Sequence, residues 1–303
     1  MFSLDQQKDF DALVPGRVRT NGANRRLALQ VGLGLGYAAA AQPVIAQSAI
    51  QTSGDGLRTG TDHCTVAGFD VPLYYAAPQT AGSHPVVLVV HEIFGVHEYI
   101  ADVCRRLAHA GYLAIAPELF ARQGDARSYA QVGQLLAEVV SKVGDAQVMA
   151  DLDAAVAWAA DHGGDTTRLG INGFCWGGRI AWLYAAHRQG LRAAVAWYGR
   201  LVGGASALTP RQPLELAASL HAPVLGLYGG QDSGIGLDSI EQMKAALAAA
   251  GAQGNSAALA AQFIVYPEAP HAFHADYRAS YRKDAAQDGF ARALAWFKAK
   301  GVL

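Results

Sequence analysis

The sequence predicts an α/β fold in which a mostly parallel β-sheet is covered by helices on both faces. Two observations lead to this prediction. Short apolar runs recur along the chain after residue 50, and longer amphipathic stretches separate them. Continuous apolar runs suit parallel strands that are buried on both faces, and regular alternation of strand and helix implies right-handed crossovers onto one sheet.

Six short apolar runs are the predicted parallel strands. They span residues 85–90, 112–116, 168–172, 193–197, 223–228 and 262–266. Before them, the segment 57–77 contains the alternating stretch Phe69-Asp-Val-Pro-Leu-Tyr-Tyr75. This segment predicts an antiparallel pair of strands at one edge of the sheet.

The amphipathic stretches between these runs are the predicted helices. They cover residues 97–110, 127–142, 146–162, 178–189, 237–250 and 279–299. No internal repeat and no long linker interrupts the alternation, so residues 47–303 are predicted to form a single domain.

Composition excludes several classes of protein. The 303 residues are 51% hydrophobic and 16% charged, which describes a globular chain with a large core and not a disordered one. The formal net charge is −1, and the 24 basic and 25 acidic residues are spread along the chain, so no surface for nucleic acid is indicated. The sequence therefore predicts a small-molecule partner.

The chain has three cysteines, Cys64, Cys104 and Cys175. They are too few and too scattered for a disulfide scaffold or a cysteine-rich zinc site. At least one of them must be unpaired within the chain, although Cys64 and Cys104 could pair in an exported protein. Neither a metal nor an organic cofactor is predicted.

Residues 1–46 resemble a twin-arginine export signal. An arginine pair at 25–26 precedes a weakly apolar run, 27–41, and a small-residue cleavage pattern follows at 44–46. This pattern predicts export by the twin-arginine machinery to the periplasm or beyond, with a mature chain that begins near residue 47. The run is shorter than the ~20 residues of a membrane-spanning helix, so no stable membrane span is predicted. The alternative is an N-terminal helix that packs on the core of a cytoplasmic protein.

Residues 173–178, which read Gly-Phe-Cys-Trp-Gly-Gly, have the pattern of a nucleophile elbow. They follow a predicted strand and precede a predicted helix, and Cys175 takes the nucleophile's place, where serine is commoner. The sharp turn strains the nucleophile's backbone and needs flanking residues without a Cβ. The helix N-terminus behind Cys175 also favours a thiolate. The alternative is that Cys175 is only a small buried apolar residue.

Asp232 and His271 are the predicted partners of Cys175. Each follows a predicted strand, and nucleophile, acid and histidine thus occur in the order of the α/β-hydrolase fold at the carboxyl ends of strands. The local competitors are His274 and Asp238, and Asp238 is expected to cap the next helix.

The loop after the predicted strand 85–90 reads His-Glu-Ile-Phe-Gly at residues 91–95. In α/β-hydrolases this loop gives one backbone N–H to the oxyanion hole, and the residue after the nucleophile gives the other. Ile93 and Trp176 are therefore the predicted donors.

Four segments together resemble the dienelactone hydrolase family. They are E-I-F-G at 92–95, P-E-L-F-A-R at 117–122, G-F-C-W-G-G at 173–178 and G-Q-D at 230–232, and the resemblance extends over residues 60–299. It implies hydrolysis of an ester or lactone. It also implies a role for Glu92, because in that family a glutamate at this place holds the resting thiol and accepts its proton when substrate binds. The alternative for Glu92 is a helix-capping or salt-bridged carboxylate.

The resemblance has a gap where that family selects its substrate. The family binds a substrate carboxylate through arginines, one of them four residues after the catalytic histidine, and that position here is Ala275. Arg122, Arg127 and Arg278 lie in segments that are able to approach the pocket. From Ala275 we predict that neutral esters or lactones are cleaved at least as well as a carboxylate-bearing dienelactone.

The sequence thus predicts an ester or lactone hydrolase in which Cys175 forms a thioester acyl-enzyme, His271 transfers protons and Asp232 orients the imidazole. A broader carboxylesterase or thioesterase with a different acyl substrate is the alternative within enzymes. A weakly active exported binding protein on the same scaffold is the alternative outside them. A redox role for Cys175 is a further interpretation, although no resolving cysteine lies near it in the sequence.

Overall fold

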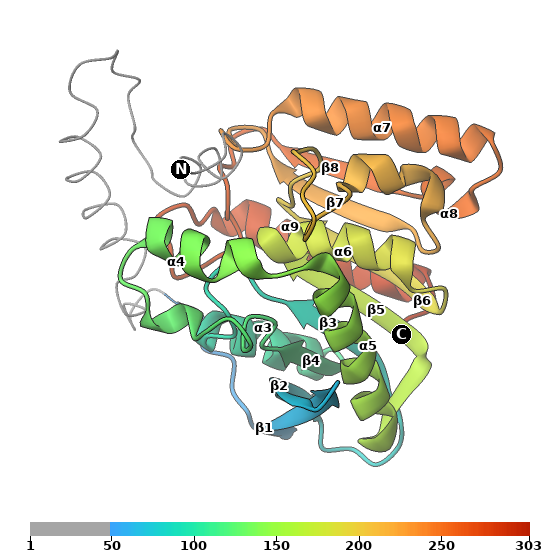
Figure 1. Ribbon diagram of the computed structural model, residues 1–303. Coiled ribbons are helices and arrows are strands. Elements are labelled where there is room, and N and C mark those ends of the chain that lie inside the picture. Colours follow the sequence, from blue (N-terminus) through green and yellow to red (C-terminus); the bar gives the residue numbers. More distant parts are fainter. Residues whose placement is uncertain (1–48) are drawn as a thin grey trace.

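The computed structural model describes residues 49–303. Its strands are β1 (Leu57–Val66), β2 (Phe69–Pro78), β3 (His84–Val90), β4 (Leu113–Pro117), β5 (Gly164–Phe174), β6 (Leu191–Trp197), β7 (Val224–Gly229) and β8 (Gln262–Tyr266). Within the described residues these eight strands form one sheet in the order β1-β2-β4-β3-β5-β6-β7-β8 (Figure 1). β2 is antiparallel to β1 and to β4, and every other neighbouring pair is parallel.

The structure confirms the predicted strands and their arrangement. The six apolar runs are β3 to β8, and the segment 57–77 is the antiparallel pair β1 and β2 at one edge of the sheet. The largest difference in length is at β5, which begins four residues before the predicted run and ends at Phe174. β5 lies in the middle of the sheet, so the residue that follows it is at the centre of the sheet's carboxyl edge.

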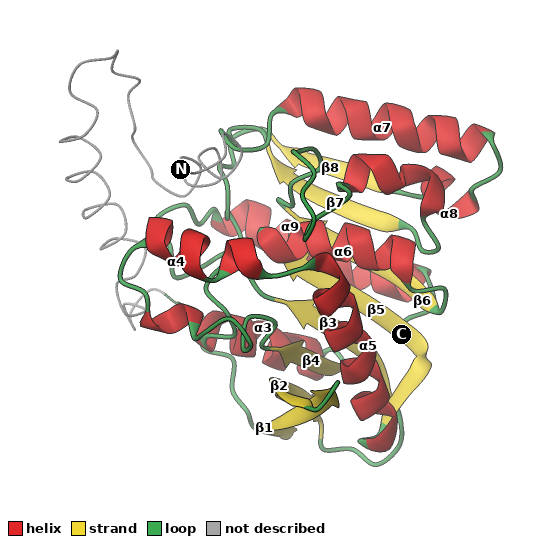
Figure 2. Cartoon of the chain, viewed as in Figure 1, coloured by secondary structure: helices red, strands yellow, loops and turns green. Residues whose placement is uncertain are grey.

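Helices cover both faces of the sheet (Figures 1 and 2). α3 (Glu98–His109) and α9 (Lys283–Ala299) lie on one face, and α5 (Asp145–Asp161) and α6 (Trp176–His187) lie on the other. α7 (Leu237–Ala252) connects β7 to the segment before β8. The layers are those that the alternation of strand and helix predicts.

The core lies between the sheet and these helices. Every residue of β3 and β4 is buried, as expected for strands that are covered on both faces. On β5, Gly170 faces α9, and a Cβ there would lie 2.9 Å from the ring of Phe297. A larger residue at Gly170 would therefore push α9 away from the central strand.

The predicted helix over 127–142 is wrong. In the structure α4 spans only Val132–Glu138, between 3₁₀ turns at Ala126–Ser128 and Val140–Lys142. No side chain caps the N-terminus of α4, and β-branched residues follow its end at Val139 and Val140. The last helix also begins later than predicted, at Lys283, because the chain makes turns up to Arg282. Two short elements had no sequence prediction, the 3₁₀ helix Pro213–Ser219 and α8 (Ser256–Leu259).

The expected cap at Asp238 is also wrong. The N-cap of α7 is Gly236, and Asp238 is the second residue of the helix. Its carboxylate therefore lies in the first turn, where the positive end of the helix dipole stabilises a negative charge.

The predicted export signal, residues 1–46, lies outside the described residues and stays a prediction, as does a mature chain that begins near residue 47. Within residues 49–303, no helix is both long enough and apolar enough to cross a membrane.

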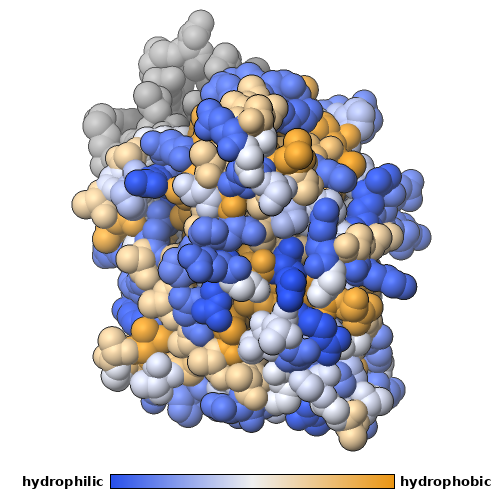
Figure 3. Space-filling model, turned by 90° about the vertical axis from the view of Figure 1, so that its right-hand side faces the viewer, coloured by the Kyte–Doolittle hydropathy of each residue, from blue (hydrophilic) through white to orange (hydrophobic). Residues whose placement is uncertain are grey.

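The surface seen in Figure 3 has polar and apolar residues interspersed. The large hydrophobic side chains that are exposed come from separate parts of the chain: Ile50, Leu208, Leu237, Leu259 and Leu303. Single exposed apolar side chains are ordinary on globular proteins and indicate no particular partner.

Candidate active site

β5 turns directly into α6 at Cys175. The backbone of Cys175 has φ 55° and ψ −114°, which is a strained conformation for a residue with a side chain. The turn is also tight. A Cβ at Gly173 would lie 1.9 Å from the carbonyl oxygen of Gly177, and one at Gly177 would lie 2.3 Å from that of Val90. The glycines of the elbow pattern are therefore required by close backbone packing, as the sequence predicts.

Cys175, His271 and Asp232 lie in series at hydrogen-bonding distances. Sγ of Cys175 is 3.2 Å from Nε2 of His271, and Nδ1 of the same ring is 2.7 Å from Oδ2 of Asp232. The three residues follow β5, β8 and β7, so the carboxyl edge of the sheet brings them together. His271 and Asp232 are buried, whereas Cys175 is partly exposed. The sulfur is therefore the member of the series that a substrate is able to reach.

The electrostatic surroundings favour a charged His271. Burial opposes a charge on the ring, but the negative charges of Asp232 and Cys175 outweigh burial and hold the pKa of His271 well above its ordinary value. A cationic imidazole beside a sulfur stabilises a thiolate. The charged imidazole lies between Asp232 and the sulfur, where it is able to stabilise negative charge that develops on Cys175.

Strained backbone is concentrated around these residues. Four non-glycine residues within 49–303 have positive φ angles, and they are Ala67, Cys175, Tyr198 and Ala272. Ala67 lies in the turn between β1 and β2, but Ala272 follows His271 directly and the ring of Tyr198 packs 5.1 Å from the imidazole. Such strain persists only where the surrounding structure fixes the backbone, so the fold imposes the positions of the sulfur and the imidazole.

Ile93 and Trp176 bring two backbone N–H groups beside the elbow. Ile93 lies in the loop after β3, and Trp176 is the first residue of α6. The side chains of both pack in a small cluster with Val132 and Leu136 of α4. Among the described residues, neither N–H donates to a protein acceptor. Both donors are thus free for a substrate oxygen, which is what an oxyanion hole requires.

Glu92 is completely buried, and it makes no hydrogen bond with Cys175. Tyr277 donates its hydroxyl hydrogen to Oε2 at 2.7 Å, and Nη1 of Arg278 is 3.9 Å from Oε1. The thiol is paired with His271 and not with Glu92, so the resting contact that the resemblance implies is not seen in this conformation. Glu92 also caps no helix, because the N-cap of α3 is His97.

The sequence matches the dienelactone hydrolase family over residues 71–301. The chain belongs to this family. It is therefore a hydrolase that acts on esters or lactones, and it has the α/β-hydrolase fold that the sequence predicts.

Three relatives show how far the likeness extends. A "Putative carboxymethylenebutenolidase" of Methylorubrum extorquens is 54% identical over 294 residues, which are 97% of this chain and 99% of that one. A protein of the same name from Escherichia coli K12 is 53% identical and covers 88% of this chain and 96% of its own. The solved structure of a "Putative Dienelactone Hydrolase" from Klebsiella pneumoniae is 56% identical, with a TM-score of 0.77 over 80% of this chain and 99% of that one. The likeness to the dienelactone hydrolase family is therefore not confined to the elbow.

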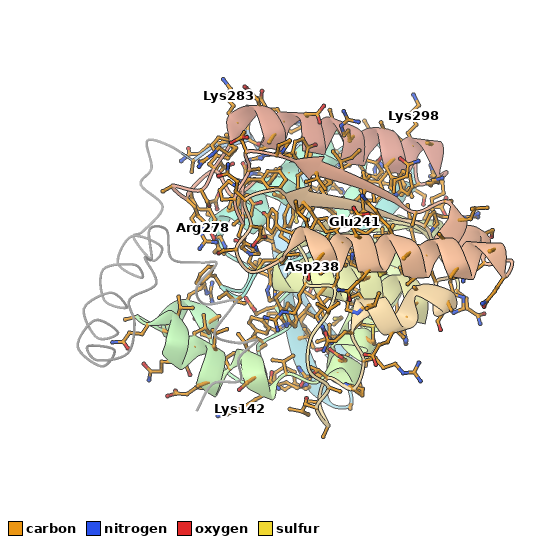
Figure 4. The ribbon with its side chains drawn as sticks, turned by 90° about the horizontal axis from the view of Figure 1, so that it is seen from above. Lys142, Asp238, Glu241, Arg278, Lys283 and Lys298 are labelled. Atoms are coloured by element: carbon orange, nitrogen blue, oxygen red, sulfur yellow. The ribbon has the colours of Figure 1, made fainter. Side chains whose placement is uncertain are left out.

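Arg278 brings a guanidinium group into the site, although Ala275 takes the place of the family's arginine. Ala275 is fully buried. Arg278 lies over the ring of Phe94, 5.4 Å from its centroid, and its Nη1 is buried without a hydrogen-bond partner. Figure 4 shows Arg278 among the loops, apart from Lys283 and Lys298, which project from the two ends of α9.

The other two candidate arginines are engaged elsewhere. Arg122 forms an ion pair with the buried Asp151. Arg127 forms one with its neighbour Asp125, and both of those side chains are exposed. Arg278 is thus the member of the predicted set that reaches Glu92.

His274, the competitor of His271, lies in an aromatic cluster. Its Nδ1 is 2.6 Å from the hydroxyl of Tyr99, and its ring is 4.4 Å from that of Trp197. Burial, together with the charge of Arg106, holds the pKa of His274 well below its ordinary value, so the ring is neutral. His271, and not His274, lies within hydrogen-bonding distance of Cys175.

Two tyrosines of this site, Tyr198 and Tyr277, were not predicted from the sequence. Tyr198 follows β6 directly, and its place at the carboxyl end of a strand was a signal that could have identified it. Tyr277 gave no such signal, because its position depends on the path of the loop between His271 and α9.

Proposed function

We propose that this member of the dienelactone hydrolase family cleaves its substrate with Cys175 as the nucleophile, through a thioester acyl-enzyme. The observation that carries the proposal is the series of contacts from Cys175 through His271 to Asp232, whose loops follow β5, β8 and β7 at one edge of the sheet. The series supplies a nucleophile, a group that moves its protons and an anion that orients that group.

In the proposed first step, the sulfur of Cys175 attacks the carbonyl carbon and the carbonyl electron pair moves to oxygen. The backbone N–H groups of Ile93 and Trp176 stabilise the resulting oxyanion. The C–O bond to the alcohol then breaks, and the leaving oxygen takes a proton from His271. In a lactone this oxygen remains attached to the acyl chain.

In the proposed second step, water attacks the thioester carbonyl while His271 accepts a proton from it. The C–S bond breaks, the acid product leaves and the sulfur departs as a thiolate beside the protonated His271. Asp232 keeps its charge throughout and holds the ring in the orientation that both steps need.

We further propose that Glu92 accepts the thiol proton when substrate binds, as the family resemblance implies. The oxygen Oε1 of Glu92 is buried and has no hydrogen-bond partner, so it has a lone pair open to a proton. Because Glu92 and Cys175 make no hydrogen bond here, the transfer requires the thiol or the carboxylate to move. The competing account leaves activation of the thiol to His271 alone.

A broader carboxylesterase or thioesterase is the second candidate function, and it uses the same chemistry. The two candidates differ in the acyl group that the pocket accepts. The buried guanidinium of Arg278, with a free Nη1, favours a substrate that carries an anionic group near the scissile carbonyl.

The test is turnover of Cys175→Ala on a panel of lactones and aryl esters. We expect hydrolysis to be abolished on every substrate, with circular dichroism and the unfolding midpoint close to those of the wild type. Cys175→Ser is expected to retain little activity, because serine does not supply a thiolate. Cys104→Ala is a matched control, since that cysteine is buried in α3 away from the elbow and its removal should preserve turnover. A folded Cys175→Ala protein with unchanged turnover would contradict the proposal.

A further inference from the structure

The Glu92 carboxylate is fully buried, yet it accepts one hydrogen bond from the described residues. That bond comes from the hydroxyl of Tyr277 to Oε2. The other oxygen, Oε1, has no hydrogen-bond partner, and Nη1 of Arg278, at 3.9 Å, is beyond hydrogen-bonding distance. Buried polar atoms are nearly always hydrogen-bonded in proteins, so a buried carboxylate oxygen without a hydrogen-bond partner requires an explanation.

The direction of the bond between Tyr277 and Glu92 is fixed by the chemistry of the phenol. Burial, and then the negative charge of Glu92, raise the pKa of Tyr277 well above its ordinary value of 10.0. Tyr277 therefore keeps its proton at any pH at which an ester hydrolase works. The hydroxyl is always the donor in this bond, and Oε2 is always the acceptor.

The ring of Tyr277 is held in place by its neighbours. It packs 5.0 Å from the ring of His97 and 5.4 Å from that of Tyr99, so both contacts come from the beginning of α3. Its backbone belongs to the loop that begins at His271. Tyr277 thus links the loop that carries the imidazole to the loop that carries Glu92.

We infer that Tyr277 is a positioning residue, which holds Oε2 of Glu92 so that Oε1 is the oxygen that takes the thiol proton. This inference rests on the proposed role of Glu92. In the transfer the S–H bond of Cys175 breaks and an O–H bond forms at Oε1. The hydroxyl of Tyr277 remains bonded to Oε2, which changes from a carboxylate oxygen to the carbonyl oxygen of the neutral acid. His271 keeps its proton in this step, and Oε1 returns its proton to the sulfur after the thioester is hydrolysed.

Arg278 explains why Oε1 is able to remain unpaired before the transfer. Its guanidinium is electrostatically coupled to Glu92 and also to Cys175. The cation therefore stabilises the negative charge on either partner, before and after the proton moves, without a hydrogen bond that would block Oε1. The other groups that face Glu92 are the phenols of Tyr99 and Tyr198, which burial keeps protonated.

The test is a double-mutant cycle between Tyr277→Phe and Glu92→Gln, measured as kcat and kcat/KM over pH. Loss of a hydrogen bond to a charged group costs about tenfold to a hundredfold, so we expect Tyr277→Phe to lower kcat/KM by that amount. A carboxylate that has lost a donor holds its proton to higher pH, so the acid limb of the pH profile should move upward. In the Glu92→Gln background Tyr277→Phe should cause no further loss, because the group through which it acts is already gone.

Tyr184→Phe is a matched control for the loss of a buried hydroxyl. The hydroxyl of Tyr184 donates to the carboxylate of Asp153 at 2.9 Å, in a part of α6 that faces α5 and not the elbow. This variant should leave kcat/KM and the acid limb unchanged, whatever its effect on the unfolding midpoint.

Two results would overturn the inference, and they differ from the failure of the proposed function. If Tyr277→Phe lowers activity equally in the wild-type and Glu92→Gln backgrounds, Tyr277 does not act through Glu92. If Tyr277→Phe changes only the unfolding midpoint, its role is structural. The single variant Glu92→Gln reports separately on the proposed function, because unchanged turnover in that variant removes Glu92 from the mechanism and the inference with it.

Discussion

Two buried carboxylates flank the reactive pair of Cys175 and His271, and the structure treats them differently. Asp232 accepts hydrogen bonds at both oxygens, from the backbone N–H groups of Gly234 and Ile235 at Oδ1 and from the imidazole of His271 at Oδ2. Glu92 accepts one bond at Oε2, and its Oε1 has none.

The difference indicates two kinds of chemistry. A buried carboxylate whose two oxygens both accept hydrogen bonds is held in one orientation, which suits a group that orients a base. A carboxylate with one free oxygen is able to accept a proton. The carboxylate of Asp232 thus serves as a fixed anion, and the carboxylate of Glu92 serves, as we propose, as a proton acceptor.

The largest loss of activity is expected from Asp232→Asn. The amide keeps the shape of the side chain but removes the charge that supports the imidazolium, so kcat should fall by a factor on the order of 10⁴. Turnover of the purified variant and its unfolding midpoint measure the effect. A loss of less than tenfold would mean that Asp232 is not the group that orients His271.

The same variant should change the dependence of stability on pH. Folding raises the pKa of His271, so the ion pair between His271 and Asp232 stabilises the fold. This contribution is fully present below about pH 6.5, the ordinary pKa of histidine. It is lost as the pH rises through the higher pKa of the folded state. The difference in unfolding midpoint between the wild type and Asp232→Asn should therefore be larger in acid than in alkali. An equal difference at all pH values would contradict the ion pair.

The next effect in size is expected from Glu92→Gln. The amide keeps the hydrogen bond from Tyr277 but removes the basic oxygen, and a general acid–base group contributes about 10² to 10⁴ in rate. Turnover should fall within that range while the fold survives. A destabilised variant whose folded fraction keeps full activity would instead show that Glu92 is structural and that His271 alone activates the thiol.

The smallest effect is expected from Arg278→Met, and it concerns specificity. From Ala275 the sequence predicts that neutral esters are cleaved at least as well as a carboxylate-bearing dienelactone, and Arg278 is the residue able to reverse that order. A charged hydrogen bond is worth about 1.5 to 3 kcal/mol, so the variant should lower kcat/KM for a carboxylate-bearing lactone by about tenfold to a hundredfold more than for a neutral aryl ester.

The control for this prediction is Arg278→Lys, which keeps the positive charge but not the planar fork of guanidinium donors. The ratio of kcat/KM for the carboxylate-bearing lactone to kcat/KM for the neutral ester should be lower in Arg278→Lys than in the wild type, and higher than in Arg278→Met. An equal loss on both substrates would show that Arg278 does not bind the substrate carboxylate.

The sequence predicted the Asp232 side of the site more completely than the Glu92 side, for a physical reason. Cys175, Asp232 and His271 each follow a strand, and the ends of parallel strands meet at one edge of a sheet whatever the loops do. Tyr277 and Arg278 reach Glu92 only because the loop after His271 turns back across this edge before α9 begins at Lys283. The path of such a loop depends on tertiary packing, and no local pattern encodes it.

The helices also include some that local sequence patterns predict and one whose extent depends on tertiary packing. α3, α5, α6 and α7 were each predicted as an amphipathic stretch between two strands, and the structure confirms them within a few residues. The stretch 127–142 was predicted in the same way but breaks into α4 and two 3₁₀ turns, and its apolar residues are divided between two surfaces. Leu135 and Val139 pack in the main core, whereas Val132 and Leu136 pack with Ile93 and Trp176 beside the site. Periodicity predicts an amphipathic segment, but it does not show which surface that segment will cover.

The most direct test of the account is labelling of the native enzyme with iodoacetamide, with site occupancy measured by peptide mass spectrometry and turnover measured on the same samples. Cys64 and Cys104 should stay unmodified, because both are buried and burial raises the pKa of each thiol, that of Cys64 to about 11. Cys175 is partly exposed and lies beside the imidazole of His271, so it should react first. The fraction of activity lost should equal the fraction of Cys175 that is alkylated. Full alkylation of Cys175 with turnover unchanged would contradict it.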